Sequence, residues 1–86
     1  MSIADIDTSL RDGIRDAVAD ILEIEPDEIT WTSSFEQDHY ADSLQRIEIL
    51  AALERRLGIT IDQSLLPRMT DLSSTYAVVA ETLANR

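Results

Sequence analysis

The sequence contains no cysteine, and this absence excludes several kinds of site. Without thiols the chain forms neither a disulfide nor a thiolate-bound metal site. It also has no apolar run near the roughly 18 residues that a membrane-spanning helix needs. Its N-terminus lacks the basic segment followed by an apolar one that marks a secretion signal. We therefore expect a cytoplasmic protein whose residues 1–86 form a single domain.

Glycine, proline and aromatic residues are scarce: the chain has two glycines, two prolines, one tryptophan, two tyrosines and one phenylalanine. Alanine, leucine, isoleucine and acidic residues are common instead. Because glycine and proline interrupt helices and the common residues mostly favour them, this composition predicts an all-α domain.

Basic residues are also few, and the net charge is −10 at pH 7. Residues 1–42 carry all of this net charge, whereas residues 43–86 are neutral. Such acidity argues against binding to nucleic acids or anionic membranes and favours protein partners with basic surfaces. The alternative explanation is a solvated surface that keeps the protein in solution.

Apolar residues recur at helical spacing in three segments. We expect a small four-helix bundle, with three principal helices and one short helix. The first principal helix should begin near Asp7-Thr8-Ser9, which offers several capping side chains, and should end before Pro26. The second should run from about Ser43 to Leu57 and stop at Gly58.

The remaining segments are expected to connect and close this bundle. Residues 23–42 should form a long acidic loop between the first and second helices, with one turn of helix at Pro26–Ile29. A short helical segment should span Gln63–Met69. Thr70 is the expected cap of the last helix. The apolar faces expected for the first and last helices are Leu10, Ile14, Val18 and Ile21, and Leu72, Tyr76, Val79 and Leu83.

The second helix carries apolar residues on two separate arcs when its residues are placed about 100° apart around the axis. We predict that one arc packs in the core: Ile49, Leu50, Leu53 and Leu57. We interpret the other arc as a docking strip for a basic-rimmed partner, formed by Leu44, Ile47 and Ala51 with Glu48 and Glu54 beside them. Packing of one wide arc against two neighbouring helices is the alternative.

Ser43 stands between Asp42 and Leu44 at the predicted start of this helix. The first N–H groups of a helix have no intrahelical partner, and the helix dipole makes this end positive, so a phosphate is stabilised there. These residues resemble the attachment motif of acyl carrier proteins, whose Asp-Ser-Leu serine carries 4′-phosphopantetheine. The resemblance covers nearly the whole chain and rests on Leu22, Pro26–Ile29, Phe35, Asp38, Ala41–Leu44, Glu48, Glu54, Gly58, Ile61, Met69 and Thr70.

The resemblance implies a carrier without catalytic or metal-binding residues. Ser43 would be the attachment site of a covalent 4′-phosphopantetheine arm that holds acyl groups as thioesters. The implied pathway is fatty-acid, polyketide or related specialised biosynthesis. Implied partners of this monomer are a phosphopantetheinyl transferase and acyl-loading, condensing and tailoring enzymes with basic docking surfaces. The implied docking residues are Asp42, Leu44, Ile47, Glu48, Ala51 and Glu54.

The chain departs from the family pattern at three places. His39-Tyr40 stands where the family usually has Leu-Gly, and this changes the backbone freedom of the loop that enters Ser43. Arg55 and Arg56 replace acidic residues and make the second helix nearly neutral. Arg46 falls inside the core arc, where a small residue is expected. Its guanidinium would either reach the phosphate on Ser43 or cover the entrance to the bundle and limit the acyl chain.

Other functions fit the residues less well. His39 as a base for Ser43 would need a helical spacing that the loop does not provide, and no glycine-rich oxyanion turn is present. The cluster of Glu36, Asp38, His39 and Asp42 lacks the spacing of a calcium loop. Trp31 and Phe35 are expected to anchor the long loop, with a partner contact of Trp31 as the alternative. Two alternatives remain for the whole protein: a peptidyl or aminoacyl carrier, and an acidic helical adaptor without a prosthetic group.

Overall fold

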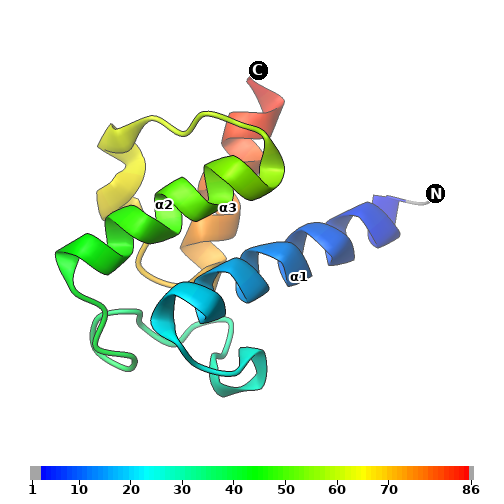
Figure 1. Ribbon diagram of the computed structural model, residues 1–86. Coiled ribbons are helices and arrows are strands. Elements are labelled where there is room, and N and C mark those ends of the chain that lie inside the picture. The colour runs from blue at the N-terminus through cyan, green and yellow to red at the C-terminus, as the bar shows by residue number, and fades with distance from the viewer. Residues whose placement is uncertain (1–2, 86) are drawn as a thin grey trace.

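The computed structural model describes residues 3–85, with the backbone alone for residues 3–7, and shows a bundle of three α-helices (Figure 1). These helices are α1 (Ile3–Leu22), α2 (Ser43–Leu57) and α3 (Leu72–Ala84). Two short 3-10 helices, η1 (Pro26–Glu28) and η2 (Gln63–Arg68), lie in the connections. The predicted all-α fold, with three principal helices, a short one and a long first loop, is confirmed. No helix in the described part of the chain has the length and apolarity needed to cross a membrane.

The helix α1 begins earlier than the sequence analysis expected. It extends to Ile3, so the prediction that it starts near residues 7–9 is wrong; the side chain of Asp7 lies outside the described part. The physical reason is that residues 3–9 contain neither proline nor glycine, so the helix continues through its exposed Thr8 and Ser9. The predicted apolar face is confirmed, because Ile14 and Val18 are fully buried and Leu10 and Ile21 pack against the core.

The limits of α2 are those predicted from the sequence. Asp42 is its N-cap: the carboxylate accepts the Gln45 N–H at 2.7 Å, and the Gln45 side-chain oxygen accepts the Asp42 N–H at 3.1 Å. Such a reciprocal pair stabilises a helix start. At the other end, Gly58 has a φ of 66° and donates its N–H to Glu54 O at 2.9 Å. Glycine adopts this left-handed conformation without steric cost, which is why α2 stops there.

The two apolar arcs of α2 have different surroundings, as predicted. Ile49, Leu50 and Leu53 are buried, and Leu57 packs against the core from a partly buried position. On the other arc the side chains of Leu44 and Ile47 are exposed and Ala51 is half-buried. One face of α2 therefore holds the bundle together while the other faces solvent.

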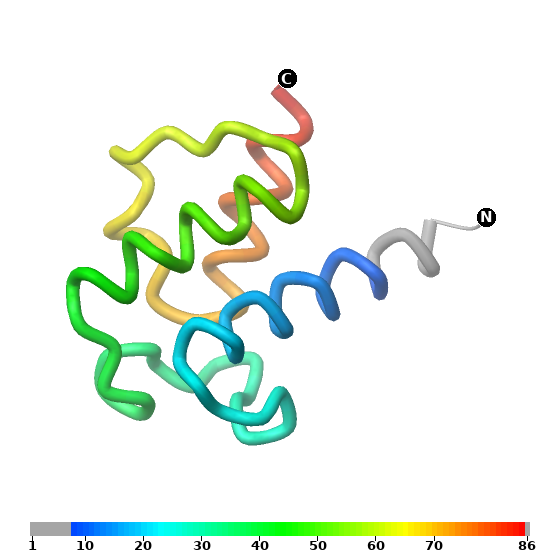
Figure 2. Tube along the Cα trace, viewed as in Figure 1, coloured from blue at the N-terminus to red at the C-terminus, as the bar shows by residue number. Residues whose placement is uncertain are grey.

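The long connection between α1 and α2 crosses the end of the bundle where α2 and α3 begin (Figure 2). Phe35 is buried in the core, and its N–H donates to Thr70 O at 2.9 Å. The Trp31 carbonyl accepts the Ser73 N–H at 3.1 Å. The prediction that Phe35 and Trp31 anchor this loop is confirmed, and the anchors fix where the chain enters α2.

An arginine clamp reinforces this anchoring. The guanidinium carbon of Arg11 in α1 lies 5.1 Å from the ring centroid of Trp31 and 5.3 Å from that of Tyr76 in α3. The two rings lie 5.8 Å apart and are tilted by 56°. Cations over aromatic faces are attracted by the ring quadrupole. The clamp thus joins α1, the long connection and α3.

The cap of α3 differs from the predicted one. Asp71, and not Thr70, is the N-cap, and its carboxylate accepts the Ser74 N–H at 2.7 Å. A carboxylate is the stronger acceptor at a positive helix end, so the charged residue takes this position. Thr70 instead donates its N–H to the Ser74 hydroxyl at 3.0 Å. The predicted apolar face of α3 is confirmed, since Leu72 and Val79 are buried while Tyr76 and Leu83 pack against the core.

The short helix η2 closes the bundle by contacting both α2 and α3. Its cap is Asp62, whose carboxylate accepts the Ser64 N–H at 2.9 Å, and this hydrogen bond lowers the Asp62 pKa below its usual value. At its other end Arg68 pairs with Glu81 of α3 at 2.9 Å across an exposed surface. The predicted short helical segment after α2 is therefore confirmed.

The two faces of α2 should respond differently to truncation. We expect Leu53→Ala to destabilise the protein by roughly 2–5 kcal/mol, because it leaves a cavity in the core. The matched variant Ile47→Ala should cost less than about 1 kcal/mol, because the exposed side chain loses little packing. Urea unfolding followed by circular dichroism measures both. Equal losses of stability would contradict the assignment of separate core and solvent faces.

Candidate functional site

Ser43 is the first residue of α2, and its side chain is exposed to solvent. Within residues 3–85, its hydroxyl makes no hydrogen bond to a described group. The core arc holds α2 rigidly, so the hydroxyl stands at a fixed place on the surface. Ser43 is therefore accessible to an enzyme that forms a bond to its oxygen.

The backbone around Ser43 has room for a phosphate. The Asp42–Gln45 pair satisfies the N–H groups of those two residues and leaves those of Ser43 and Leu44 without an intrahelical partner. Two adjacent N–H groups at the positive end of a helix suit an anion. The local backbone thus fits a phosphate ester on the Ser43 oxygen.

The surface beside Ser43 combines apolar and acidic side chains. Among the described residues, the large hydrophobic side chains that are exposed are Tyr40 (85%), Leu44 (63%) and Ile47 (48%). All three lie within four residues of Ser43. Exposed carboxylates lie before, between and after them in the sequence, at Glu36, Asp38, Asp42 and Glu48. A partner that reaches Ser43 therefore meets an apolar surface with an acidic rim.

The chain is similar in sequence to known proteins. A family model described as "Phosphopantetheine attachment site" matches residues 12–81, which include Ser43. A Streptomyces avermitilis protein named polyketide-8 synthase acyl carrier protein 1 is 51% identical over 93% of this chain and 95% of its own length. The chain belongs to the acyl carrier proteins. Acyl carrier proteins from Streptomyces coelicolor and Treponema denticola are 37% and 48% identical over 87% and 77% of this chain, and over 83% and 85% of their own lengths.

Family membership establishes what the protein carries. It is an acyl carrier protein, and the cofactor of this family is a covalently attached 4′-phosphopantetheine. Carrier proteins of this kind interact with a phosphopantetheinyl transferase and with biosynthetic enzymes. The geometry around Ser43 agrees with this cofactor, because the exposed hydroxyl and two free N–H groups suit a phosphate ester.

Two of the predicted docking residues also hold the fold. Asp42 caps α2, as described above. Glu54 is half-buried, and one of its carboxylate oxygens accepts the Ile61 N–H at 2.9 Å. This bond fixes the chain just after α2. It joins residues seven positions apart across a turn, and sequence reasoning missed it.

His39 is engaged within the loop and not with Ser43. Its Nε2 atom and the Ser33 hydroxyl share a hydrogen bond 2.9 Å long. This contact was not predicted from the sequence. No group of three or more possible metal ligands occurs in the part of the chain that the structure describes.

Arg46 makes a contact with the segment after α2 that the sequence analysis did not name. The Arg46 side chain is half-buried, and a guanidinium N–H donates to Leu66 O in η2 at 3.3 Å. Leu66 also lines an apolar hollow of about 130 Å³ together with Ile47, Leu50 and Gln63. Arg46 therefore links α2 to the wall of this hollow that η2 forms.

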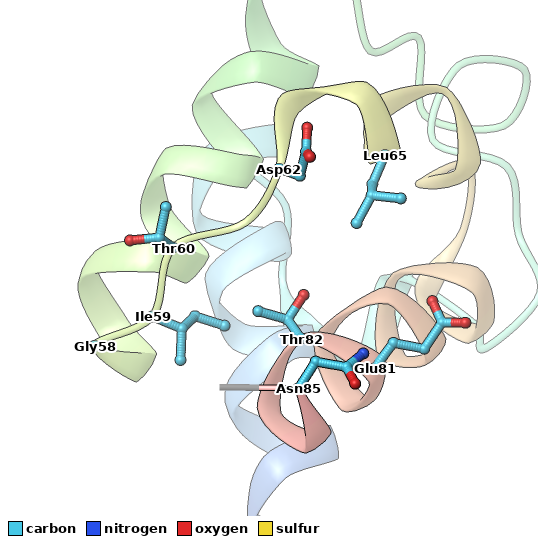
Figure 3. Close-up of a pocket in the computed structure, with 8 residues that line it drawn as sticks. All are labelled: Gly58, Ile59, Thr60, Asp62, Leu65, Glu81, Thr82 and Asn85. Atoms are coloured by element: carbon cyan, nitrogen blue, oxygen red, sulfur yellow. The ribbon is translucent and has the colours of Figure 1, made fainter.

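The size of this hollow compares with that of known small-molecule cavities. An apolar cavity of about 150 Å³ accommodates one benzene molecule, so a hollow of 130 Å³ has room for a short acyl chain. A larger hollow of about 670 Å³ lies between the segment after α2 and the end of α3 (Figure 3). Its lining includes Thr60 and Asp62 from that segment and Glu81, Thr82 and Asn85 from the end of the chain. It is at the other end of α2 from Ser43, about 22 Å away by the helical rise, and is not part of the attachment site.

The hydrogen bond from Arg46 to η2 should restrict the entry of a long acyl chain into the bundle. We expect the backbone chemical shifts of Leu50 and Leu53 to differ little between short- and long-chain acyl forms of the wild-type protein. Arg46→Thr should enlarge this difference, because it removes the guanidinium that ties the wall of the hollow to α2. Two-dimensional NMR measures the shifts, and Arg55→Thr, an exposed arginine on the same helix, is the control. Large chain-length-dependent shifts in the wild-type protein would contradict the restriction.

Proposed function

We propose that Ser43 is the attachment site and that residues 1–86 act as a single, non-catalytic carrier domain. The observation that carries this proposal is the exposed Ser43 hydroxyl at the start of α2, beside two N–H groups without helical partners. The family model that matches the chain spans this residue. The bound arm supplies a thiol that holds acyl groups as thioesters.

We propose polyketide biosynthesis as the pathway of this carrier, with fatty-acid or related biosynthesis as the alternative. Two of its relatives are named as acyl carrier proteins of polyketide-8 synthase, and one of them shares 51% identity. A peptidyl carrier is less well supported by these names. A monomeric state and a cytoplasmic location stay predictions.

Modification of Ser43 tests this proposal directly. Incubation with coenzyme A, magnesium and a broad-specificity phosphopantetheinyl transferase should add one 4′-phosphopantetheine per chain, measured by intact mass. Ser43→Ala should abolish the addition without loss of helicity by circular dichroism, because its side chain is exposed. Ser9→Ala, at an exposed serine of α1, should be modified like the wild type.

The control for this experiment is a second carrier protein treated in the same way. If that carrier gains the arm and the wild-type protein does not, the attachment site is wrong. The acidic adaptor without a prosthetic group would then be favoured.

We further propose that partners dock on α2 through basic surfaces. The supporting residues are exposed and border Ser43: two apolar side chains, Leu44 and Ile47, and the carboxylates of Asp42 and Glu48. The half-buried Ala51 and Glu54 continue this surface along the helix. Opposite charges across such a rim raise the association rate without tight binding, which suits a carrier that visits several enzymes.

Reversing a charge on α2 should slow the modification of Ser43 by the transferase. Glu48→Lys should lower kcat/KM for modification of Ser43 by on the order of threefold or more at low salt, because it repels a basic docking surface. The effect should shrink as the salt concentration rises. Asp20→Lys makes the same charge change at an exposed position near the end of α1 and serves as the matched control. Equal slowing by both variants would show that net charge alone, and not docking on α2, controls the rate.

A further inference from the structure

Tyr40 has a backbone conformation that its side chain does not favour. Its φ is 59°, in the left-handed region that non-glycine residues rarely adopt. The turn requires this geometry: Tyr40 donates its N–H to Glu36 O at 3.1 Å, and Ala41 donates its N–H to Phe35 O at 2.8 Å. Both Ala41 and Phe35 are buried, so the turn returns the chain to the core just before α2. Glycine would meet this requirement with less strain.

The side chain of Tyr40 does nothing inside the molecule to offset this strain. It is 85% exposed, compared with 63% for Leu44 and 48% for Ile47, the other exposed large hydrophobic side chains in the described part of the chain. An aromatic ring at a strained and exposed position contributes little to the fold. A strained and exposed aromatic residue of this kind indicates a role in binding a partner and not in stabilising the fold.

Tyr40 lies close to Ser43 in the chain, and this indicates which partner its side chain contacts. Consecutive Cα atoms are about 3.8 Å apart, so the Tyr40 Cα lies within about 11 Å of the Ser43 Cα. Exposed carboxylates of Glu36, Asp38 and Asp42 stand on the same short stretch of chain. The Tyr40 ring is therefore an exposed apolar group that lies close to the Ser43 hydroxyl and has acidic residues near it in the sequence.

The enzyme that attaches the arm must bring its active site to that hydroxyl. When the arm is attached, the Ser43 oxygen attacks the coenzyme A phosphorus next to the pantetheine, and a new P–O bond forms. The bond from this phosphorus to the bridging oxygen breaks, adenosine 3′,5′-bisphosphate leaves, and the hydroxyl proton passes to a base of the enzyme. Enzymes that act on cargo work at the far end of a flexible arm, so they need not cover residue 40.

We propose that Tyr40 is a specificity-determining contact for the phosphopantetheinyl transferase that modifies Ser43. The ring enters an apolar pocket beside the active site of this enzyme, and the carboxylates around it face basic side chains. Tyrosine suits this role because it brings a large, rigid and amphipathic contact. This inference rests on the proposed attachment at Ser43 and adds the residue by which the first partner recognises the carrier.

The test compares wild type, Tyr40→Phe, Tyr40→Asn and Tyr40→Gly as unmodified proteins with coenzyme A, magnesium and a phosphopantetheinyl transferase. We expect the Tyr40→Asn and Tyr40→Gly variants to have a kcat/KM about tenfold lower, mainly because KM rises. Loss of a tyrosine from an interface produces an effect of about this size. Tyr40→Phe should keep most of the rate because it keeps the ring. Thermal midpoints of the Asn and Gly variants should equal or exceed that of the wild type, since both residues tolerate a positive φ.

A second measurement separates this contact from general docking. Wild type and Tyr40→Asn are converted fully to the modified form by prolonged incubation, and an acyl-loading enzyme then acts on each. Equal loading rates support the assignment to the transferase, whereas equal slowing in both assays overturns it. Equal modification rates for wild type and Tyr40→Asn also overturn it and leave attachment at Ser43 intact. A wild-type protein that is not modified at all overturns the attachment itself.

Discussion

The reciprocal hydrogen bonds between Asp42 and Gln45 fix where α2 begins, and the position of Ser43 depends on that start. These bonds satisfy two of the N–H groups at the helix end and leave those of Ser43 and Leu44 available. A start shifted by one residue would change which N–H groups lie next to the serine oxygen. The cap is thus a structural feature that also shapes the attachment site.

Packing in the core fixes the orientation of the rest of α2. Burial of Ile49, Leu50 and Leu53 sets the rotation of the helix about its axis, and that rotation turns Leu44 and Ile47 outward. Because both faces belong to one rigid helix, the surface beside Ser43 is held by the same packing that stabilises the bundle. Truncation of the outer face and truncation of the inner face therefore affect different properties.

The sequence predicted those features that arise from local pattern. Helical spacing and capping chemistry gave the limits of α2 and its two arcs, and the family motif pointed to Ser43. The hydrogen bonds from Arg46 to Leu66 and from Ile61 to Glu54 were not predictable, because they depend on how separate segments fold back on each other. The start of α1 was misplaced because polar residues that can cap a helix lie inside it, and the cap of α3 because two neighbouring polar residues could both fill that position.

The turn before α2 shows where local preference yields to a wider constraint. Its backbone must place Ala41 in the core and start α2 two residues later, and this demands a left-handed residue at position 40. Local rules favour glycine there, yet the chain has an exposed tyrosine. Departures from local preference are expected to gather at functional sites, where another requirement offsets the strain. The Tyr40 ring adds no packing to the fold. Contact of this ring with the enzyme that approaches Ser43 is therefore what offsets the backbone strain.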